Sequence, residues 1–306
     1  MKRPILAITL GDPAGIGPEI VLNSLTQREI YQRCRPLVVG DAQILSGGEA
    51  LEAQHSRPLG LSSFRALRHY RAALKVKPIL NPAQASYHFG TVDVLHIPQD
   101  NFSELSVGKP SKIGGECSAR AVKKSIELAI TQLAQGVVHA PISKTAWRMA
   151  GVNYLGHTEM IGSLCVKKKV AMAIVSEPLR TVMVTRHLPL NQIAKNLKKK
   201  DIVSTIELAQ NWLEQLGLRH PKIGVCALNP HAGENGSLGE EEIRVIRPAI
   251  RLVERYLNFI VSGPLPADSA FRDHKRGLYD CLVTMYHDQS LIPLKLFISF
   301  YLFISG

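Results

Sequence analysis

Short apolar runs that end in polar residues recur along this chain. The clearest is Cys281-Leu-Val-Thr284, which leads directly into Met285-Tyr-His-Asp-Gln289. Such a run is typical of a buried strand that places polar side chains at its carboxyl end. Between these runs lie amphipathic segments such as residues 116–135, whose apolar residues have helical spacing and which Gly136 follows. Strands that alternate with helices predict an α/β fold with a largely parallel sheet, whose ligands bind where the strands end.

The composition is that of a globular protein with one large or two medium domains. With 306 residues, 45% of them hydrophobic, the chain can bury a full core. Its five cysteines are scattered and include no C-x-x-C pair, so we expect a reducing compartment and no disulfide framework. The sequence has no signal peptide and no apolar stretch of membrane-spanning length. We therefore expect a cytoplasmic protein without a membrane partner.

The chain carries a formal net charge of +12. A basic surface attracts phosphates, whether on nucleic acid or on a small substrate. The densest basic runs are Lys167-Lys-Lys169 and Lys198-Lys-Lys200, which are typical of solvated helix or loop surface. The sequence has no helix-turn-helix, zinc-finger or aromatic-basic RNA-binding signature. We therefore expect a phosphorylated small molecule, not nucleic acid, as the ligand.

A glycine-rich loop lies near the N-terminus. Residues 11–17, Gly-Asp-Pro-Ala-Gly-Ile-Gly, separate an expected strand at residues 5–10 from an expected helix that opens at Pro18. A strand, a glycine loop and a helix in this order can cradle a phosphate. The glycines at 11, 15 and 17 do not have the G-x-G-x-x-G spacing of a dinucleotide site. Spacing alone favours a tight structural turn over a phosphate site.

Four histidines lie in polar loops of the chain, namely His157, His187, His231 and His287. The last three each follow an expected strand, so their imidazoles converge if those strands are parallel neighbours. Three neutral imidazoles suit Zn²⁺, Co²⁺ or a similar divalent ion and leave positions open for substrate. Separate, hydrogen-bonded histidines are the alternative. Asp268 and Asp288 could orient a ligand or a metal-bound water.

Six motifs together identify a family resemblance. They are Gly11-Asp-Pro-Ala-Gly-Ile-Gly-Pro-Glu19, Gly156-His-Thr-Glu159, His187-Leu-Pro-Leu190, Asn229-Pro-His-Ala-Gly-Glu234, Gly263-Pro-Leu-Pro-Ala-Asp268 and Tyr286-His-Asp-Gln289. In this order, from residue 5 to about residue 296, the chain resembles the 4-hydroxythreonine-4-phosphate dehydrogenase family of pyridoxal phosphate biosynthesis.

The resemblance implies an isocitrate/isopropylmalate dehydrogenase-like fold, with two α/β/α subdomains and a cleft between them. On this basis we expect residues 1–125 plus 291–306 to form the first subdomain. Residues 126–290 would form the second and carry most metal and substrate ligands. The family also implies a homodimer with its active site at the subunit interface.

The activity that the resemblance implies is the NAD-dependent and metal-dependent oxidation of 4-phosphooxy-L-threonine. The product, 2-amino-3-oxo-4-phosphooxybutanoate, would decarboxylate to 3-amino-2-oxopropyl phosphate in pyridoxine 5'-phosphate biosynthesis. Dehydrogenases of 4-phospho-D-threonate and 4-phospho-D-erythronate share the motifs, so these substrates stay open. NAD would bind without a Rossmann glycine fingerprint. A metal-dependent phosphoryl or acyl transferase is an alternative of another class, because fold does not fix chemistry.

The resemblance also implies the metal ligands. His187, His231 and His287 match them, with one ligand expected from the partner subunit. The ion would be Zn²⁺, Co²⁺ or Mg²⁺. It would hold the substrate hydroxyl and lower its pKa as hydride leaves for the nicotinamide.

His157 and Thr158 match substrate-binding positions, and Lys295 matches a substrate-binding lysine. Together with Asp268 and Asp288, Lys295 is also a candidate catalytic residue. The sequence does not identify the residues that bind the cofactor.

After Leu296 the resemblance ends. The family continues through segments that carry a substrate-binding asparagine and arginine and help to form the cofactor site. Here residues 297–306 read Phe-Ile-Ser-Phe-Tyr-Leu-Phe-Ile-Ser-Gly, and Ser290 stands where the family usually has glycine. We expect weakened binding of NAD and phosphate, or an inactive homologue. The apolar tail predicts a buried terminal strand or, if it is exposed, an aggregation-prone segment.

Overall fold

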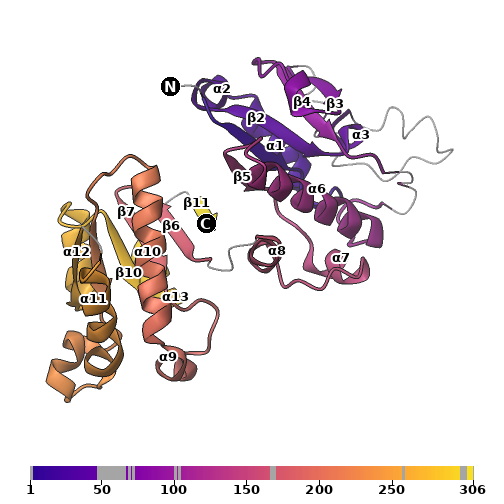
Figure 1. Ribbon diagram of the computed structural model, residues 1–306. Coiled ribbons are helices and arrows are strands. Elements are labelled where there is room, and N and C mark those ends of the chain that lie inside the picture. The colour runs from indigo at the N-terminus through magenta and orange to yellow at the C-terminus, as the bar shows by residue number, and fades with distance from the viewer. Residues whose placement is uncertain are drawn as a thin grey trace. The chain divides into compact units, whose positions relative to one another are not determined.

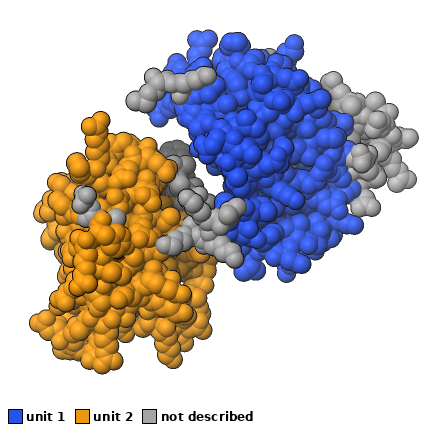
Figure 2. Space-filling model, in the orientation of Figure 1, with its two compact units in different colours: residues 1–168 blue, residues 169–306 orange. Residues whose placement is uncertain are grey.

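The computed structural model describes residues 3–46, 67, 70, 73–99, 102, 105–165, 170–256, 259–296 and 302–305. The chain forms two compact units, residues 1–168 and residues 169–306. Figure 1 shows that each unit consists of a β-sheet with helices packed against it, and Figure 2 colours the two units separately. The predicted α/β class is confirmed in both units. The basic run at residues 167–169 lies outside the described residues.

Within its described residues, the first unit has one five-stranded parallel sheet in the order β3-β4-β2-β1-β5. The strands are β1 (Ile5–Thr9), β2 (Arg35–Gly40), β3 (Lys75–Ile79), β4 (Thr91–His96) and β5 (Gly136–His139). The central strands are apolar because a parallel sheet is buried on both faces. On β2, Leu37 and Val39 join one core cluster and Val38 joins another, as the two-residue period of a strand requires.

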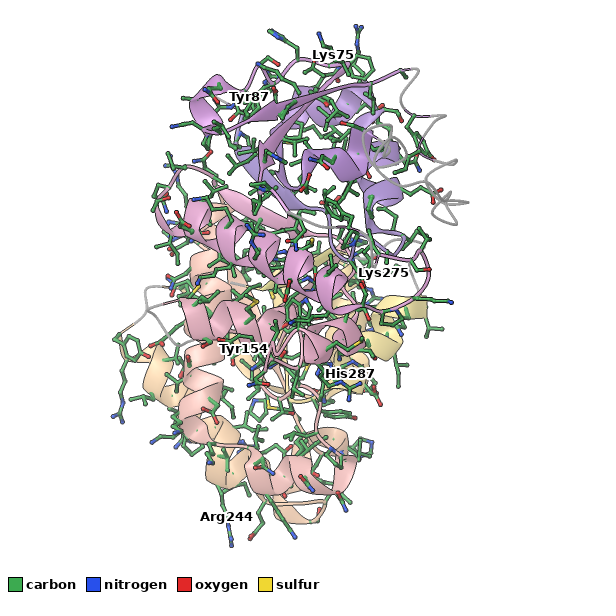
Figure 3. All side chains as sticks on the ribbon, turned by 90° about the vertical axis from the view of Figure 1, so that its right-hand side faces the viewer. Lys75, Tyr87, Tyr154, Arg244, Lys275 and His287 are labelled. Atoms are coloured by element: carbon green, nitrogen blue, oxygen red, sulfur yellow. The ribbon has the colours of Figure 1, made fainter. Side chains whose placement is uncertain are left out.

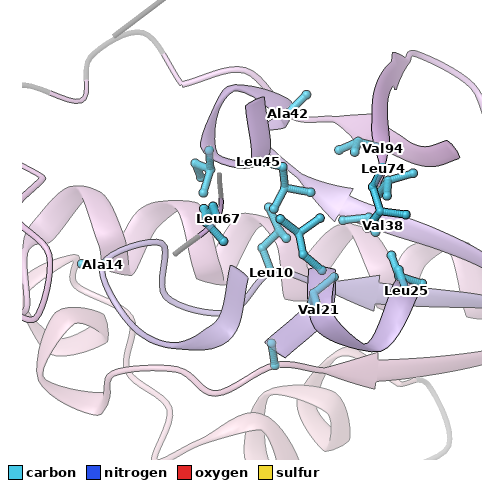
Figure 4. Packing of buried hydrophobic residues seen from close by; sticks show 14 of the residues in the cluster. Leu10, Ala14, Val21, Leu25, Val38, Ala42, Leu45, Leu67, Leu74 and Val94 are labelled. Atoms are coloured by element: carbon cyan, nitrogen blue, oxygen red, sulfur yellow. The ribbon is translucent and has the colours of Figure 1, made fainter. Parts of the chain in front are cut away.

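Helices cover both faces of this sheet. They are α1 (Gly17–Leu25), α2 (Arg28–Arg33), α3 (Ala42–Ser46), α6 (Lys112–Ile130), α7 (Lys144–Met149) and α8 (His157–Leu164), with the short turn η1 (Pro82–Gln84). Helix α6 packs along β1 and β2 and is the helix predicted at residues 116–135. Figure 4 shows the core cluster that includes Leu10 and Val21, where α1 packs beside β2.

The described part of the second unit has a mixed sheet in the order β11-β6-β7-β10-β8-β9. The strands are β6 (Met172–Ser176), β7 (Leu179–Met183), β8 (Lys222–Cys226), β9 (Ile260–Leu265), β10 (Cys281–Thr284) and β11 (Leu302–Ser305). Strands β7, β10, β8 and β9 are parallel, whereas β6 and β11 run antiparallel to their neighbours. The parallel strands therefore end at one common edge.

The helical segments of the second unit follow its strands. They are α9 (Leu190–Asn196), α10 (Lys199–Gln215), η2 (Pro230–Gly236), the π-helix η3 (Glu242–Ile246), α11 (Arg247–Glu254), α12 (Ala267–Lys275) and α13 (His287–Leu296). The amphipathic pattern of α10 is clear, because Ile202, Ile206, Ala209 and Leu213 are all buried. They pack against the strands together with residues of α11.

Strand pairing and helix packing fix the chain segments within each unit. Helix α6 spans Lys112–Ile130 without interruption, and β5 pairs with β1 of the first unit. In the second unit, α13 contacts β7 and β10, and β11 pairs with β6. The expected subdomains, residues 1–125 plus 291–306 and residues 126–290, stay a prediction. Backbone ladders and a continuous packed helix hold these segments where they are, and one chain segment cannot leave such a ladder without losing its hydrogen bonds.

The strand expected in the tail is present at Leu302–Ser305. The side chains of this strand lie outside the part of the chain that the structure describes, and so do residues 297–301 and 306. The expected burial of the tail therefore stays a prediction. Among the helices that the structure describes, none has the length and apolar character needed to cross a membrane.

Candidate functional site

The common edge of the second sheet carries the three histidines expected to bind metal. Strand β10 lies between β7 and β8, and all three are parallel. His187 follows β7, His287 follows β10 at the start of α13, and His231 lies in η2 after β8. The condition set by the sequence, three parallel neighbouring strands, is therefore met. Asp268 follows β9, the next strand along, in the first turn of α12.

Two of these imidazoles lie together. The ring centres of His187 and His287 are 5.5 Å apart and their planes are tilted by 50°; His287 is labelled in Figure 3. The Nδ1 atom of His287 lies 2.7 Å from Oδ1 of Asp288. A carboxylate at Nδ1 fixes the orientation of the ring and leaves Nε2 as the nitrogen that could bind a metal.

The described side chains include no group of three or more His, Cys, Asp or Glu residues arranged to hold a metal ion. Among the described residues, His187 and His287 lie together, and no three-residue set with His231 is formed. Lys295 lies in the last turn of α13, whereas His287 opens that helix. Eight residues of α-helix separate the two backbones by about 12 Å along the helix axis.

Hydrogen bonds tie the ends of the three histidine-bearing strands to one another. The backbone N–H and the hydroxyl of Thr185 both donate to the carbonyl of Met285, at 3.1 and 2.6 Å. Gln289 accepts from the N–H of Met285 and donates to the carbonyl of Ala227, both at 2.7 Å. Gln289 is only 8% exposed. The amide therefore fixes the end of β10 against the end of β8, next to both loops that carry histidines.

Ser290 replaces the glycine usual in the family without disturbing this edge. It is fully buried, and its hydroxyl lies 2.6 Å from the hydroxyl of Thr284 on β10. The Ser290 hydroxyl can donate to Thr284, whose own hydroxyl lies 3.5 Å from the carbonyl oxygen of Val182, so the buried serine has a hydrogen-bond partner.

His231 lies in a strained backbone segment. Five consecutive residues, His231 to Asn235, have φ between +42° and +77°. Left-handed backbone costs about 1–2 kcal/mol for each residue other than glycine, and Gly233 is the one glycine of the five. Such a run persists only where neighbouring contacts determine it, and strain of this kind clusters at functional sites.

The carboxyl edge of the first sheet holds a second pair of histidines. His139 ends β5, His157 opens α8, and their rings stack with centres 4.6 Å apart and planes 19° from parallel. The edge of the buried Trp147 meets His157 at 5.8 Å. Nδ1 of His139 lies 3.2 Å from the hydroxyl of Thr9. Thr158, the other substrate-binding candidate, follows His157 in the first turn of α8.

Both stacked imidazoles are neutral near pH 7. Burial lowers the pKa of His139 to about 3, helped by the neighbouring His157, and burial lowers the pKa of His157 to about 4. The Nε2 atoms of both rings are buried and have no hydrogen-bond partner within the described chain. A neutral ring with such an atom can offer a hydrogen bond to a ligand but no charge.

The sequence did not single out His139. The signal was available, because Val137-Val-His139 is an apolar run that ends in a histidine, the same pattern that drew attention to His287. His139 has no neighbouring carboxylate in the sequence, so the pattern did not mark it as a candidate site residue.

Backbone contacts explain the glycines of the N-terminal loop. Gly11 has a φ of +69°, and a Cβ atom there would lie 2.2 Å from the carbonyl oxygen of Pro141. A Cβ atom on Gly17 would lie 2.2 Å from the carbonyl oxygen of Leu10. Asp12 donates its N–H to Pro141 and accepts from the N–H of Ala14 with its carboxylate. The tight structural turn favoured by the spacing is therefore present.

A pocket beside this loop has an unsuitable charge for phosphate. Its lining in the described chain comprises Pro13, Ala14, Gly15, Ile16, Pro18, Glu19, Leu67, Val107 and Gly108. Glu19 is acidic and no lining residue is basic. The nearby carboxyl of Asp12 is 4% exposed, and burial raises its pKa. An acidic, largely apolar lining disfavours an anion here.

Comparison with known proteins adds an independent finding. The family model described as "Pyridoxal phosphate biosynthetic protein PdxA" matches residues 32–300. The "4-hydroxythreonine-4-phosphate dehydrogenase" of Desulforapulum autotrophicum is 35% identical over 296 residues, which are 96% of this chain and 82% of that protein. The "Putative D-threonate 4-phosphate dehydrogenase" of Symbiobacterium thermophilum is also 35% identical, with the same shares covered. The crystal structure of 4-hydroxythreonine-4-phosphate dehydrogenase from Klebsiella pneumoniae has a TM-score of 0.83 and 34% identity, covering 96% of this chain and 83% of that chain.

Proposed function

The chain belongs to the pyridoxal phosphate biosynthetic protein PdxA family, and from this premise we propose that it is an NAD-dependent, metal-dependent dehydrogenase of a phosphorylated hydroxy acid. The proposed substrate is 4-phosphooxy-L-threonine, oxidised to 2-amino-3-oxo-4-phosphooxybutanoate, which then decarboxylates to 3-amino-2-oxopropyl phosphate. The observation that carries the proposal is the pair of imidazoles, His187 and His287, whose ring centres are 5.5 Å apart in the segments that follow the adjacent parallel strands β7 and β10.

The donor atoms at this edge fit a divalent ion. His187, His231 and His287 would hold it, with one of the three supplied by the partner subunit of a homodimer. Imidazole nitrogens suit Zn²⁺ or Co²⁺, whereas Mg²⁺ prefers oxygen ligands, so the ligand set favours the first two ions. When bound, the ion would lower the pKa of the substrate hydroxyl, and NAD would accept the hydride.

The chain's own residues would orient the metal ligands and hold the substrate. Asp288 fixes the His287 ring through its Nδ1 atom, which leaves Nε2 for the ion. Gln289 locks the ends of β10 and β8, so the two histidine loops keep their spacing. Lys295 is the proposed binding residue for substrate negative charge. Asp268, Asp288 and Lys295 are the proposed candidates for moving the hydroxyl proton.

In the first unit, His157 and Thr158 are the proposed substrate-binding residues. His157 is held between His139 and Trp147. Because both imidazoles stay neutral, they would recognise an oxygen of the substrate by hydrogen bonding and would leave charge neutralisation to lysine.

A second candidate substrate is D-threonate 4-phosphate. It is favoured by the relative of that name, whose 35% identity equals that of the 4-hydroxythreonine-4-phosphate dehydrogenase relative. The same metal and hydride chemistry serves both substrates, since each carries a hydroxyl on the carbon next to the phosphorylated carbon.

Steady-state formation of NADH tests the proposal and separates the substrates. With Zn²⁺ or Co²⁺ present, one phosphorylated hydroxy acid should give the highest kcat/KM, and a chelator should abolish the reaction. A calorimetric titration with NAD identifies an inactive homologue, which would bind none. Folded protein that binds NAD and metal but oxidises none of the phosphorylated hydroxy acids would overturn the proposed activity.

A further inference from the structure

The loop that carries His231 is held by one buried carboxylate. Glu242 is the first residue of the π-helix η3 and is fully buried. Its Oε1 atom accepts from the N–H groups of Leu228 and Asn229, both at 2.8 Å. Its Oε2 atom accepts from the side-chain amide of Asn229 at 3.0 Å. Glu242 thus fixes the backbone between the end of β8 and the start of the left-handed segment.

The same carboxylate also shapes the middle of that segment. A Cβ atom on Gly233 would lie 2.6 Å from Oε2 of Glu242 and 2.9 Å from the carbonyl oxygen of Gly239. The carboxylate therefore approaches the backbone two residues after His231 as closely as a glycine permits. Leu238 closes the loop by donating its N–H to the carbonyl of Gly233.

Two unusual backbone features meet at this carboxylate. Residues 231–235 are left-handed, and the helix that supplies Glu242 begins with π-helical turns. Single π-turns and left-handed residues both occur preferentially at functional sites.

We propose that Glu242 is a positioning residue that holds His231 in the backbone conformation in which its imidazole can bind the metal. This inference rests on the proposed function for its metal, but not for the conformation that Glu242 imposes. Buried partners that orient metal ligands affect affinity strongly even though they never touch the ion.

The test compares Glu242→Gln with a matched control. Glutamine keeps the shape and one acceptor oxygen, but its amide would face the amide of Asn229, donor against donor. We expect Glu242→Gln to weaken the binding of Co²⁺ alone, followed by its visible absorption, by about 10- to 100-fold. The control is Glu240→Gln, because Glu240 pairs with the exposed Arg244, which projects from the surface in Figure 3. It should leave the affinity unchanged.

A combined variant separates positioning from general damage. The amide of Asn229 donates to Glu241 at 2.7 Å as well as to Glu242, so Asn229→Asp is combined with both Glu241→Gln and Glu242→Gln. This variant restores donors facing acceptors and should recover most of the Co²⁺ affinity. In metal-free protein, HN–Hα couplings and Cα shifts of residues 231–235 should report positive φ for the native chain and lose that signature in Glu242→Gln. Folded Glu242→Gln protein that keeps both the couplings and the Co²⁺ affinity overturns the inference. Native protein that binds no Co²⁺ refutes the proposed metal site instead, and the couplings then still decide the role of Glu242.

Discussion

At the scale of single residues, the hydrogen bond between His287 and Asp288 gives the sharpest prediction. Asp288→Asn replaces a charged acceptor with a neutral amide 2.7 Å from Nδ1 of His287. The ring then loses the partner that fixes its tautomer and orientation, so the affinity for Co²⁺ should fall by about tenfold or more. Asp273→Asn, which removes a surface partner of Arg272, is the control. Equal Co²⁺ affinities for Asp288→Asn and native protein would show that the carboxylate does not serve the ring.

The stacked pair of His139 and His157 predicts acid sensitivity of the first unit. Both have folded-state pKa values, about 3 and about 4, below the ordinary value. The unfolded chain therefore binds more protons between about pH 6.5 and pH 4, and stability falls as pH falls through this window. Each imidazole contributes at most about 1.4 kcal/mol per pH unit.

Urea unfolding at several pH values checks this slope. Trp147 reports on the first unit in a Trp212→Phe background, because Trp212 belongs to α10 of the second unit. His139→Phe keeps a stacked ring but removes one titrating group, so the loss of stability between pH 7 and pH 5 should become shallower. His88→Phe, at an exposed position, should leave the slope as it is. A slope that stays unchanged in His139→Phe would contradict the burial argument.

At the scale of elements, Gln289 is the tie between strand ends. Gln289→Met keeps the volume but leaves the N–H of Met285 and the carbonyl of Ala227 without their partner. Buried, unsatisfied polar groups cost about 1–3 kcal/mol each, so the free energy of unfolding should drop by about 2–6 kcal/mol. Urea unfolding followed by Trp212 fluorescence measures it, and Gln215→Met on the exposed end of α10 is the control. A loss below about 0.5 kcal/mol, the size of ordinary surface effects, would mean that the tie is unimportant.

Elements and their order were largely predictable from the sequence. The strand before His287 and the helix at residues 116–135 follow from apolar periodicity, which is a local property. The left-handed turn at His231 was not predictable, because its conformation depends on Glu242, a residue eleven positions away that is buried beside it. His139 was missed for a related reason, since its significance comes from stacking on His157 across a loop.

At the scale of the whole molecule, the placement of chain segments depends on pairing between strands that are distant in sequence. The chain forms compact units that divide near residue 168, and the subdomain boundaries near residues 125 and 291 that the family resemblance implies stay a prediction. Strand β5 pairs with β1, and β11 pairs with β6. Strand partners distant in sequence are not encoded in local periodicity, so the sequence alone could not place them.

The last prediction follows from the proposed homodimer. The described residues of one chain form no three-residue ligand set, so we propose that three histidines from two subunits bind one ion. His187→Ala, His231→Ala and His287→Ala should each lose Co²⁺ binding as homodimers. If one ligand comes from the partner subunit, a mixed dimer of two variants rebuilds one intact site whenever the two mutations affect ligands from different subunits. Random exchange makes half of all dimers mixed, so about a quarter of the sites return.

Two of the three pairwise mixtures should therefore recover Co²⁺ binding and one should not. The pair that fails to complement identifies the two ligands that a single subunit supplies. Labelling one variant of each pair with ¹⁵N, so that native mass spectrometry resolves the mixed dimers by mass, provides the control for subunit exchange. If exchange is demonstrated and no pair recovers binding, all three ligands must come from one chain, and the proposed shared site is wrong. Complementation would instead explain why the edge formed by β7, β10 and β8 brings His187 and His287 together without a third ligand among the residues that the structure describes.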